Sequence, residues 1–213
     1  MNSAIADLRK EYSSQRLMET EIEANPIDQF QKWWTEAINS QIEEVNAMTL
    51  ATASSDGMPA ARIMLLKGFD KNGFAFYSNY KSYKAMHLEE NPKACLVFFW
   101  KELERQVRIT GLVKKIPTNE SDEYFLSRPI GSQVGAWASN QSQVIENREW
   151  LENRYLQLTE EFRQKELKRP AYWGGYVVTP VIVEFWQGRP SRLHDRIQYT
   201  LEGGNWKIER LSP

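Results

Sequence analysis

Helical periodicity marks the first long segment of the chain. After Pro26, apolar side chains recur every three or four positions through Ile42, as in a helix with one buried face. Proline is well tolerated in the first turn of a helix, so Pro26 fits its start. Three further helices are predicted: a short one from Ser82 to Glu90, one from Thr118 to about Arg128-Pro129, and a long charged one over residues 144–166. Residues 130–143 read as a polar, Gly-containing loop.

Short apolar or alternating runs between these helices predict strands. The sharpest turn signal is Asn72-Gly73, because these residues tolerate the positive φ of a tight hairpin. The predicted strands cover residues 47–54, 61–68, 74–78, 94–100, 106–116, 173–184, 192–200 and 206–211. Short antiparallel connections favour an α+β fold on a small barrel or sandwich over a doubly wound parallel sheet. We expect one domain over residues 1–213, with about residues 1–20 as a mobile arm and residues 4–16 as a short helix or extended arm.

Composition removes several classes of function. The 27 Lys and Arg against 28 Asp and Glu give a net charge of -1, which argues against a generic nucleic-acid binder. A single Cys excludes an intrachain disulfide and a Cys-rich zinc site, and the two His show no HExxH spacing. No apolar run approaches the ~20 residues of a membrane span, and the N-terminus lacks a secretory h-region, so a reduced cytoplasmic protein is expected. The GxGxxG, P-loop and GxSxG motifs are all missing.

The run from Arg192 to Arg196 is the first candidate for chemistry. On the predicted strand, Arg192, His194 and Arg196 share one face, which suits an anionic ligand and disfavours a charged imidazole. The alternative is a solvated edge strand whose charges pair with Asp195 or Glu184, and spacing alone does not choose between the two.

Two cations bracket the apolar strand from Arg62 to Lys67. Their odd separation places them on opposite faces, so they serve two ligands unless a bulge intervenes. Taken alone, an ordinary strand that ends in a solvated lysine explains them better.

Several polar groups stand where strands and helices meet. They share the ability to bind phosphate or the polar edge of a ring. Tyr124, Arg128 and Ser132 lie at a helix end, and Ser78 and Lys84 lie at a strand-to-helix junction. Gln106 and Arg108 share one strand face, Gln141-Ser142 lies in the polar loop, and Trp186 lies at a strand end. Each has a structural alternative, such as a Tyr–Arg surface stack, capping by Ser82 or a core aromatic. Together they suit a phosphorylated planar cofactor and a phosphorylated small substrate.

Longer motifs carry a family resemblance over nearly the whole chain. They are Arg9-Lys10-Glu11-Tyr12, RIMLLKGFD, GFAFYSNYKSYKA, LERQVRITG, YFLSRPIGSQVGAWASNQS, YWGGYVV, VEFWQGRPSRLHDR and WKIERLSP. In this order they resemble the pyridoxamine/pyridoxine 5′-phosphate oxidase family, and RPxxSQxGAWxSxQS with EFWQG…RLHDR is the most specific combination. The resemblance implies an FMN-binding antiparallel split β-barrel with flanking helices. It also implies a homodimer with its sites at the subunit interface.

The resemblance assigns roles residue by residue. FMN contacts would come from Arg62, Ile63, Met64, Leu65, Leu66, Lys67, Tyr77, Ser78, Lys84, Gln106, Gln141, Ser142, Trp186 and Arg196. Substrate contacts would come from the arm residues Arg9, Lys10, Glu11 and Tyr12, from Lys67, Tyr124, Arg128 and Ser132 at the phosphate, and from Arg192, Leu193 and His194 near the ring. Arg192 and His194 are the implied catalytic pair. Tyr83 departs from the family, which commonly has a basic residue there, so one FMN-phosphate cation is missing.

The implied reaction is oxidation of pyridoxine or pyridoxamine 5′-phosphate to pyridoxal 5′-phosphate, with dioxygen reduced to hydrogen peroxide. Arg62 would then serve the cofactor phosphate and Lys67 the substrate phosphate, which accounts for their odd spacing.

Two alternatives stay open at this point. Another split-barrel flavoprotein, such as a flavin reductase, would consume a nicotinamide nucleotide. A carrier of flavin or pyridoxal phosphate would bind its ligand without turnover.

Overall fold

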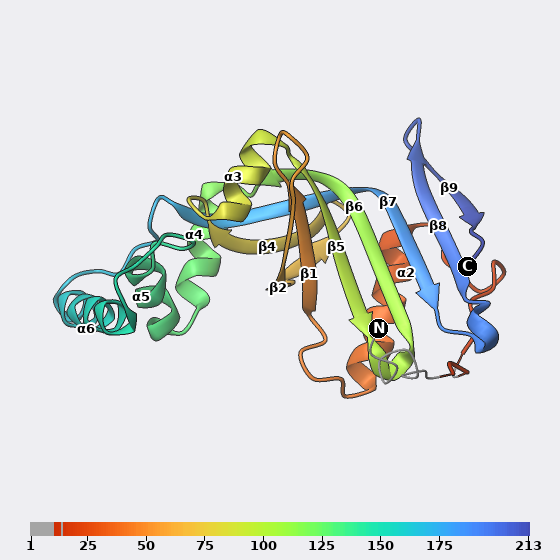
Figure 1. The fold of residues 1–213 in the computed structure, drawn as a ribbon, viewed down its shortest axis with the longest axis horizontal. Helices are drawn as coiled ribbons and strands as arrows, with labels where there is room; N and C mark the ends of the chain where they lie inside the picture. The colour runs from red at the N-terminus through yellow and green to blue at the C-terminus, as the bar shows by residue number, and fades with distance from the viewer. Residues whose placement is uncertain (1–10, 14) are drawn as a thin grey trace, which may run out of the picture.

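One curled antiparallel sheet organises the molecule, and it is described here from a computed structural model of residues 11–13 and 15–213 (Figure 1). Its nine strands are β1 (Ala47–Ala53), β2 (Pro59–Leu65), β3 (Gly68–Asp70), β4 (Gly73–Asn79), β5 (Lys93–Trp100), β6 (Arg105–Lys115), β7 (Trp173–Gln187), β8 (Asp195–Glu202) and β9 (Asn205–Arg210). The order is β2-β1-β5-β6-β7-β4-β3, and β8 pairs with β7 and β9. The predicted α+β class on an antiparallel split barrel is therefore confirmed.

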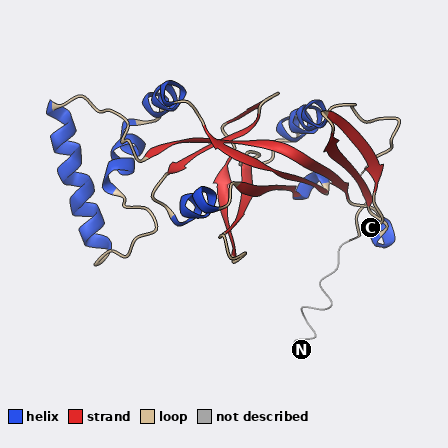
Figure 2. Cartoon of the chain, turned by 90° about the horizontal axis from the view of Figure 1, so that it is seen from above, coloured by secondary structure: helices blue, strands red, loops and turns tan. Residues whose placement is uncertain are grey.

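Five α-helices and two short 3₁₀ turns accompany the sheet in the described part of the chain. They are α2 (Pro26–Asn39), α3 (Tyr83–Glu90), α4 (Thr118–Ser127), α5 (Ile130–Ala138), α6 (Arg148–Gln164), η1 (Lys101–Leu103) and η2 (Pro190–Arg192). Seen from above, the sheet runs through the middle of the molecule with helices on both sides (Figure 2). Helices α5 and α6 lie at one end and β8 with β9 at the opposite end (Figure 1). None of the helices described has the length and apolar character that a membrane span requires.

Helix α2 packs its apolar stripe into the concave core. Asn25 caps its first turn by accepting a 2.8 Å hydrogen bond from the Ile27 amide, and Pro26 opens it as the sequence predicts. Phe30 is fully buried, and its ring centroid lies 4.9 Å from that of Phe74 and 5.2 Å from that of Phe98. This edge-to-face aromatic packing fixes the helix against β4 and β5.

Strand β7 connects the two ends of the molecule. Its 15 residues pair with β4 at the amino end, with β8 at the carboxyl end, and with β6 along most of their length. A register shift in β6 lies between Thr110 and Gly111, where a Cβ on Gly111 would lie 2.2 Å from the Thr179 carbonyl oxygen. At ~3.3 Å per residue, the two ends of an extended strand of this length stand about 45 Å apart.

Two of the sequence predictions are wrong. Residues 130–138 form helix α5 instead of a loop, because Val134 and Ala138 are buried against Leu158 of α6 and this packing outweighs the glycines. The strand predicted over residues 192–200 begins only at Asp195. Ser191 and Arg192 adopt left-handed φ values of 55° and 62°, which an extended strand cannot accommodate.

Other boundaries differ by a few residues. Helix α6 starts at Arg148 and not at residue 144, because Asn147 caps it by accepting a 2.7 Å hydrogen bond from the Trp150 amide. Strand β7 continues past Glu184 to Gln187, where β8 and β6 still pair with it. Of the predicted arm, residues 11–13 and 15–18 are neither helix nor strand, and residues 1–10 lie outside the described residues.

Candidate active site

A cavity of about 480 Å³ gathers many of the predicted ligand-binding residues, and we call it the β4 pocket. It lies between the end of β2, the middle of β4 and the α4–α5 turn, and its lining comprises Ile63, Met64, Leu65, Lys67, Tyr77, Ser78, Tyr124, Arg128, Pro129, Ser132, Gln141 and Trp173. A second hollow of about 300 Å³ shares Arg128, Ser132, Gln141 and Trp173 with it. The two hollows therefore adjoin, and we call them together the concave site.

Lys84 sits buried beside this pocket with neutral partners. Its Nζ donates to Oε1 of Gln141 at 2.9 Å, to Oγ of Ser78 at 3.2 Å and to Oγ of Ser82 at 3.3 Å. Burial, assisted by the positive charge of Arg62, holds the pKa of Lys84 down to about 8. A buried cation with only neutral acceptors is costly, and a bound anion would relieve that cost. The chemistry of these donors therefore fits a phosphate group.

Arg62 approaches the same region from β2. Its Nη1 donates to the Leu50 carbonyl oxygen at 3.1 Å and to Oγ1 of Thr52 at 2.9 Å, and burial lowers its pKa. Lys67 follows the end of β2, lines the β4 pocket and has an exposed side chain. Arg62 is not among the lining residues, and Lys67 lies beyond the end of β2, so strand alternation does not relate the two side chains. That they serve two ligands stays a prediction.

Arg128 carries an unsatisfied donor into the site. Its guanidinium carbon lies 4.6 Å from the centre of the Trp173 ring, and Nη2 donates to the Ser132 carbonyl oxygen at 2.9 Å. Its Nη1 is buried and has no hydrogen-bond partner among the described residues. Because buried polar atoms are nearly always paired, this N–H marks the position of an acceptor such as a phosphate oxygen.

Stacked aromatic rings form one wall of the β4 pocket. The ring centroids of Tyr77 and Tyr124 are 3.8 Å apart, and that of Trp173 lies 5.6 Å from Tyr77. The sequence predicted Tyr124 and Arg128 on one helix face, but α4 ends at Ser127 and Arg128 is its extended C-cap. Both still line the pocket. Trp173 was missed, although its position next to Gly174-Gly175 at a strand start is the kind of site where an aromatic ring can lie flat.

A second group of predicted residues lies at the carboxyl end of β7. The His194 ring is 4.6 Å from Trp186, and Tyr12 packs edge-on at 5.8 Å from Trp186 and 6.0 Å from His194. The Arg189 amide donates to Nδ1 of His194 at 3.1 Å, so the neutral ring carries its proton on Nε2. Burial, followed by the charge of Arg192, lowers the pKa of His194, which agrees with the predicted neutral imidazole.

The cross-strand register groups the remaining candidates. Gln106, Trp186 and Arg196 lie directly opposite one another on β6, β7 and β8, so their side chains share one face of the sheet. Arg196 pairs with Glu184, as the structural alternative anticipated, but β8 lies between β7 and β9 and is not the edge strand that this alternative assumed. The proposed common strand face of Arg192, His194 and Arg196 is wrong, because the first two precede the strand.

The other predicted residues are placed as follows. Leu66 is buried in the core, Ser142 follows Gln141 in the turn after α5 with φ 70°, and Leu193 is 70% exposed. Glu11 is exposed, whereas Arg9 and Lys10 lie outside the described residues.

The two groups of candidates stand apart within one chain. Ser78 pairs with Gly174 near the start of β7, and Trp186 lies about a dozen residues further along the same strand, or about 40 Å if it is extended. A single small ligand cannot touch both groups of one chain.

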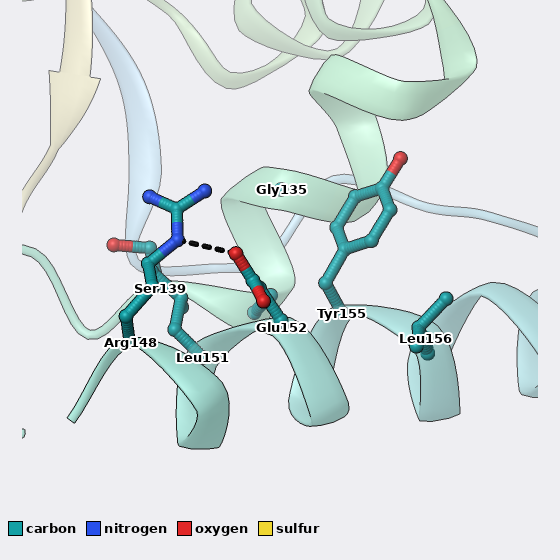
Figure 3. Close-up of a pocket in the computed structure, with 8 residues that line it drawn as sticks. Gly135, Ser139, Arg148, Leu151, Glu152, Tyr155 and Leu156 are labelled. Carbon is teal, nitrogen blue, oxygen red and sulfur yellow. Dashed lines mark hydrogen bonds and ion pairs between the residues drawn. The ribbon is translucent and has the colours of Figure 1, made fainter. Parts of the chain in front are cut away.

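A further cavity of about 530 Å³ lies between α5 and α6 (Figure 3). Leu151, Tyr155 and Leu156 line it, and Arg148 and Glu152 form a 2.6 Å ion pair at its side. Because the two charges neutralise each other, this cavity lacks the free cation that a phosphate requires. None of the predicted site residues lines it.

Comparison with known proteins agrees with this geometry. A family model described as pyridoxamine 5′-phosphate oxidase matches residues 34–160. A second, described as pyridoxine 5′-phosphate oxidase C-terminal dimerisation region, matches residues 173–213. The pyridoxine/pyridoxamine 5′-phosphate oxidase of Cyanothece sp. is 55% identical, with 100% of both chains covered. That of Salinibacter ruber is 53% identical over 99% of this chain and 100% of its own.

Solved structures show the same fold. PhzG from Burkholderia lata, in complex with tetrahydrophenazine-1-carboxylic acid, superposes with a TM-score of 0.89 at 29% identity, covering 94% of this chain and all of its own. An FMN binding protein from Nostoc punctiforme reaches 0.71 at 16% identity, covering 90% of this chain and 100% of its own, which supports the fold alone. Because the first family model spans more than half of the chain and its relatives match along its whole length, the chain belongs to the pyridoxine/pyridoxamine 5′-phosphate oxidase family of oxidoreductases.

Proposed function

We propose that this chain oxidises pyridoxine 5′-phosphate and pyridoxamine 5′-phosphate to pyridoxal 5′-phosphate, with FMN as cofactor and dioxygen as electron acceptor. The alcohol and dioxygen would give the aldehyde and hydrogen peroxide, and the amine would also consume water and release ammonia. One observation carries the proposal. Two separate cations stand at the concave site: buried Lys84, whose hydrogen bonds go to neutral acceptors, and Arg128, whose Nη1 has no partner among the described residues. This arrangement suits two phosphorylated ligands.

The donor set divides between these two ligands. Lys84, Ser78 and Gln141, with Arg62 behind them, would hold the FMN phosphate. Lys67, Tyr124, Arg128 and Ser132 would hold the phosphate of the substrate, and that binding energy would align the ring for reaction. Bound FMN supplies two-electron redox chemistry, so the protein contributes position and electrostatics.

A homodimer would complete the site. The dimerisation region matched at residues 173–213 suggests a homodimer, and it contains the distant group of candidates, Trp186, Arg192, His194 and Arg196. We propose that one protomer supplies the β4 pocket and its partner supplies this group together with Gln106. Arg192 would assist removal of the substrate proton. His194, neutral and with Nε2–H free to donate, would orient the substrate.

The remaining expectations belong to the same proposal. We propose a single domain over residues 1–213 that acts in the cytoplasm on small molecules, with no nucleic-acid partner. Tyr12, which already packs on Trp186 and His194, would close over the bound substrate as part of the arm.

The experiment is a direct assay of the purified protein. It is loaded with FMN, its visible spectrum is recorded, and pyridoxine 5′-phosphate is added in air while aldehyde absorbance and hydrogen peroxide are followed. We expect equal amounts of both products without a nicotinamide nucleotide. Strict dependence on a nicotinamide nucleotide would identify a flavin reductase, and ligand binding without peroxide would identify a carrier. Light scattering should give twice the 24.9 kDa of one chain, and a monomer with full activity would contradict the shared site.

A further inference from the structure

Glu184 is a buried carboxylate on the face that carries the distant group of candidates. It lies on β7 and is only 4% exposed. It precedes Trp186 by two positions, so both side chains point to the same face of the sheet. A buried carboxylate is expensive unless it is paired, so its partners indicate what it does there.

Two arginines on the flanking strands satisfy this carboxylate. Arg196 on β8 donates from Nε to Oε1 at 2.8 Å and from Nη2 to Oε2 at 3.2 Å. Arg108 on β6 donates from Nη1 to Oε2 at 3.1 Å. The two-point contact with Arg196 fixes the plane of that guanidinium as well as its position.

The exposed sides of the arginines remain available to a ligand. The side chain of Glu184 is 6% exposed, against 25% for Arg196 and 47% for Arg108, so the carboxylate lies beneath two partly open cations. Arg196 also donates from Nη1 to the Ser212 carbonyl oxygen at 2.8 Å. Each of its Nη atoms bears a second N–H. Because Glu184 fixes the plane of the Arg196 guanidinium, these second N–H groups are the ones that can point away from Glu184 toward a ligand.

Charge balance gives Glu184 a second effect. It places one negative charge between two positive ones, and without it the guanidiniums of Arg108 and Arg196 would repel each other across β7. Arg196 would lose two of the three hydrogen bonds that hold it.

We propose that Glu184 is a positioning residue, which holds Arg196 in the orientation that contacts FMN on the Gln106 and Trp186 face. This inference rests on the proposed function, because it takes FMN as the ligand of Arg196. It concerns a residue that would not touch the cofactor itself and would act only through its partners.

The test compares FMN dissociation constants of apo-protein variants, measured by quenching of flavin fluorescence. Glu184→Gln keeps the size of the side chain but presents an NH₂ group to a guanidinium, so it should weaken FMN binding about tenfold. Glu184→Asp keeps the charge and should recover part of that loss. In an Arg196→Gln background, Glu184→Gln should change the dissociation constant by less than about twofold, because the residue acts through Arg196.

Glu36→Gln is the matched control. Glu36 pairs at 2.5 Å with Arg105, which is buried on the opposite face of the same β6 strand. This change should lower the melting temperature of the apo-protein and leave FMN affinity unchanged. If the Gln variant at position 184 does not fold, the Asp variant is compared in the same two backgrounds.

Each outcome decides one question. Unchanged FMN affinity in folded Glu184→Gln, or losses that add fully to those of Arg196→Gln, would overturn the positioning role. Failure of the wild-type protein to bind FMN would instead refute the proposed function. The two failures are therefore distinguishable.

Discussion

Nζ of Lys84 donates a 2.9 Å hydrogen bond to Oε1 of Gln141, which lies 57 residues further along the chain. The contact joins the start of α3 to the turn after α5 and closes one side of the β4 pocket. Because the amide is neutral, it does not offset the positive charge that Lys84 carries when it is protonated. We therefore expect Lys84 to affect two properties, the stability of the protein without FMN and its affinity for the FMN phosphate.

Replacing Lys84 should separate these two effects. Lys84→Met should weaken FMN binding at least tenfold, because a charge-assisted contact to phosphate is lost. The neighbouring exposed residue provides the control: Lys81→Met should leave the affinity unchanged. Equal affinities of wild type and Lys84→Met in a fluorescence titration would remove Lys84 from the phosphate site.

Stability of the apo-protein should depend on pH through the same lysine. Its folded-state pKa of about 8 lies below the ordinary value of 10.5. Between these values the unfolded chain binds a proton that the folded chain has released, so the free energy of unfolding rises with pH, by up to about 3 kcal/mol. Denaturant titrations from pH 7.5 to 10.5 should show this rise in the wild type relative to Lys84→Met. Parallel curves would contradict it.

Arg128→Ala should chiefly raise KM for the phosphorylated substrates. The change removes the unpaired Nη1 donor and the stack on Trp173, which corresponds to a loss of about tenfold or more in binding. Steady-state kinetics with pyridoxine 5′-phosphate measure it. Arg154→Ala on α6, where the arginine donates to Gln157 of its own helix and does not line the β4 pocket, is the control. An unchanged KM would place the substrate phosphate elsewhere.

Arg192→Ala should reduce turnover far more than FMN affinity. Arg192 lies in η2, two residues before His194, and we propose that it assists removal of the substrate proton. Loss of a group that assists proton transfer costs on the order of 10²-fold or more in kcat. Parallel losses in kcat and FMN affinity would identify Arg192 as a cofactor ligand.

Arg210 should hold the arm in place. It donates to both carboxylate oxygens of Glu19 at 2.6 and 2.7 Å, to the Leu17 carbonyl oxygen at 2.8 Å and to Asp195 at 2.8 Å. Arg210→Gln should speed tryptic cleavage after Arg16, whereas Lys207→Gln in an exposed pair on the same strand should not. Identical digestion rates would show that other contacts hold the arm.

Low pH should weaken the same contact between Arg210 and Glu19. Hydrogen bonds from Arg210 lower the pKa of Glu19 from 4.5 to about 2. A depressed carboxyl pKa contributes stability above pH 4.5 that is lost as the pH falls toward 2. Cleavage after Arg16 by an acid-tolerant protease of matching specificity should therefore accelerate below pH 4.5 in the wild type but not in Glu19→Gln.

Local sequence determined the elements whose signals lie within a few residues. The Asn25-Pro26 pair starts α2 through a cap that its own side chain provides. The β3–β4 hairpin turns at Lys71 and Asn72, between the paired Asp70 and Gly73, with Gly73 at φ 133° and Asp70 accepting a 2.7 Å hydrogen bond from the Asn72 amide. The residue types of the site, and the family to which they belong, could also be recognised from the sequence.

Only the tertiary structure decided what depends on distant partners. Helix α5 forms because α6 covers Val134 and Ala138, and β8 begins at Asp195 because the left-handed turn at Ser191 and Arg192 precedes it. The distance between the two groups of candidates could not be predicted from the sequence either. That distance follows from the length of β7, which pairs with β4 at one end and β8 at the other, and our proposal of a site shared between two chains rests on it.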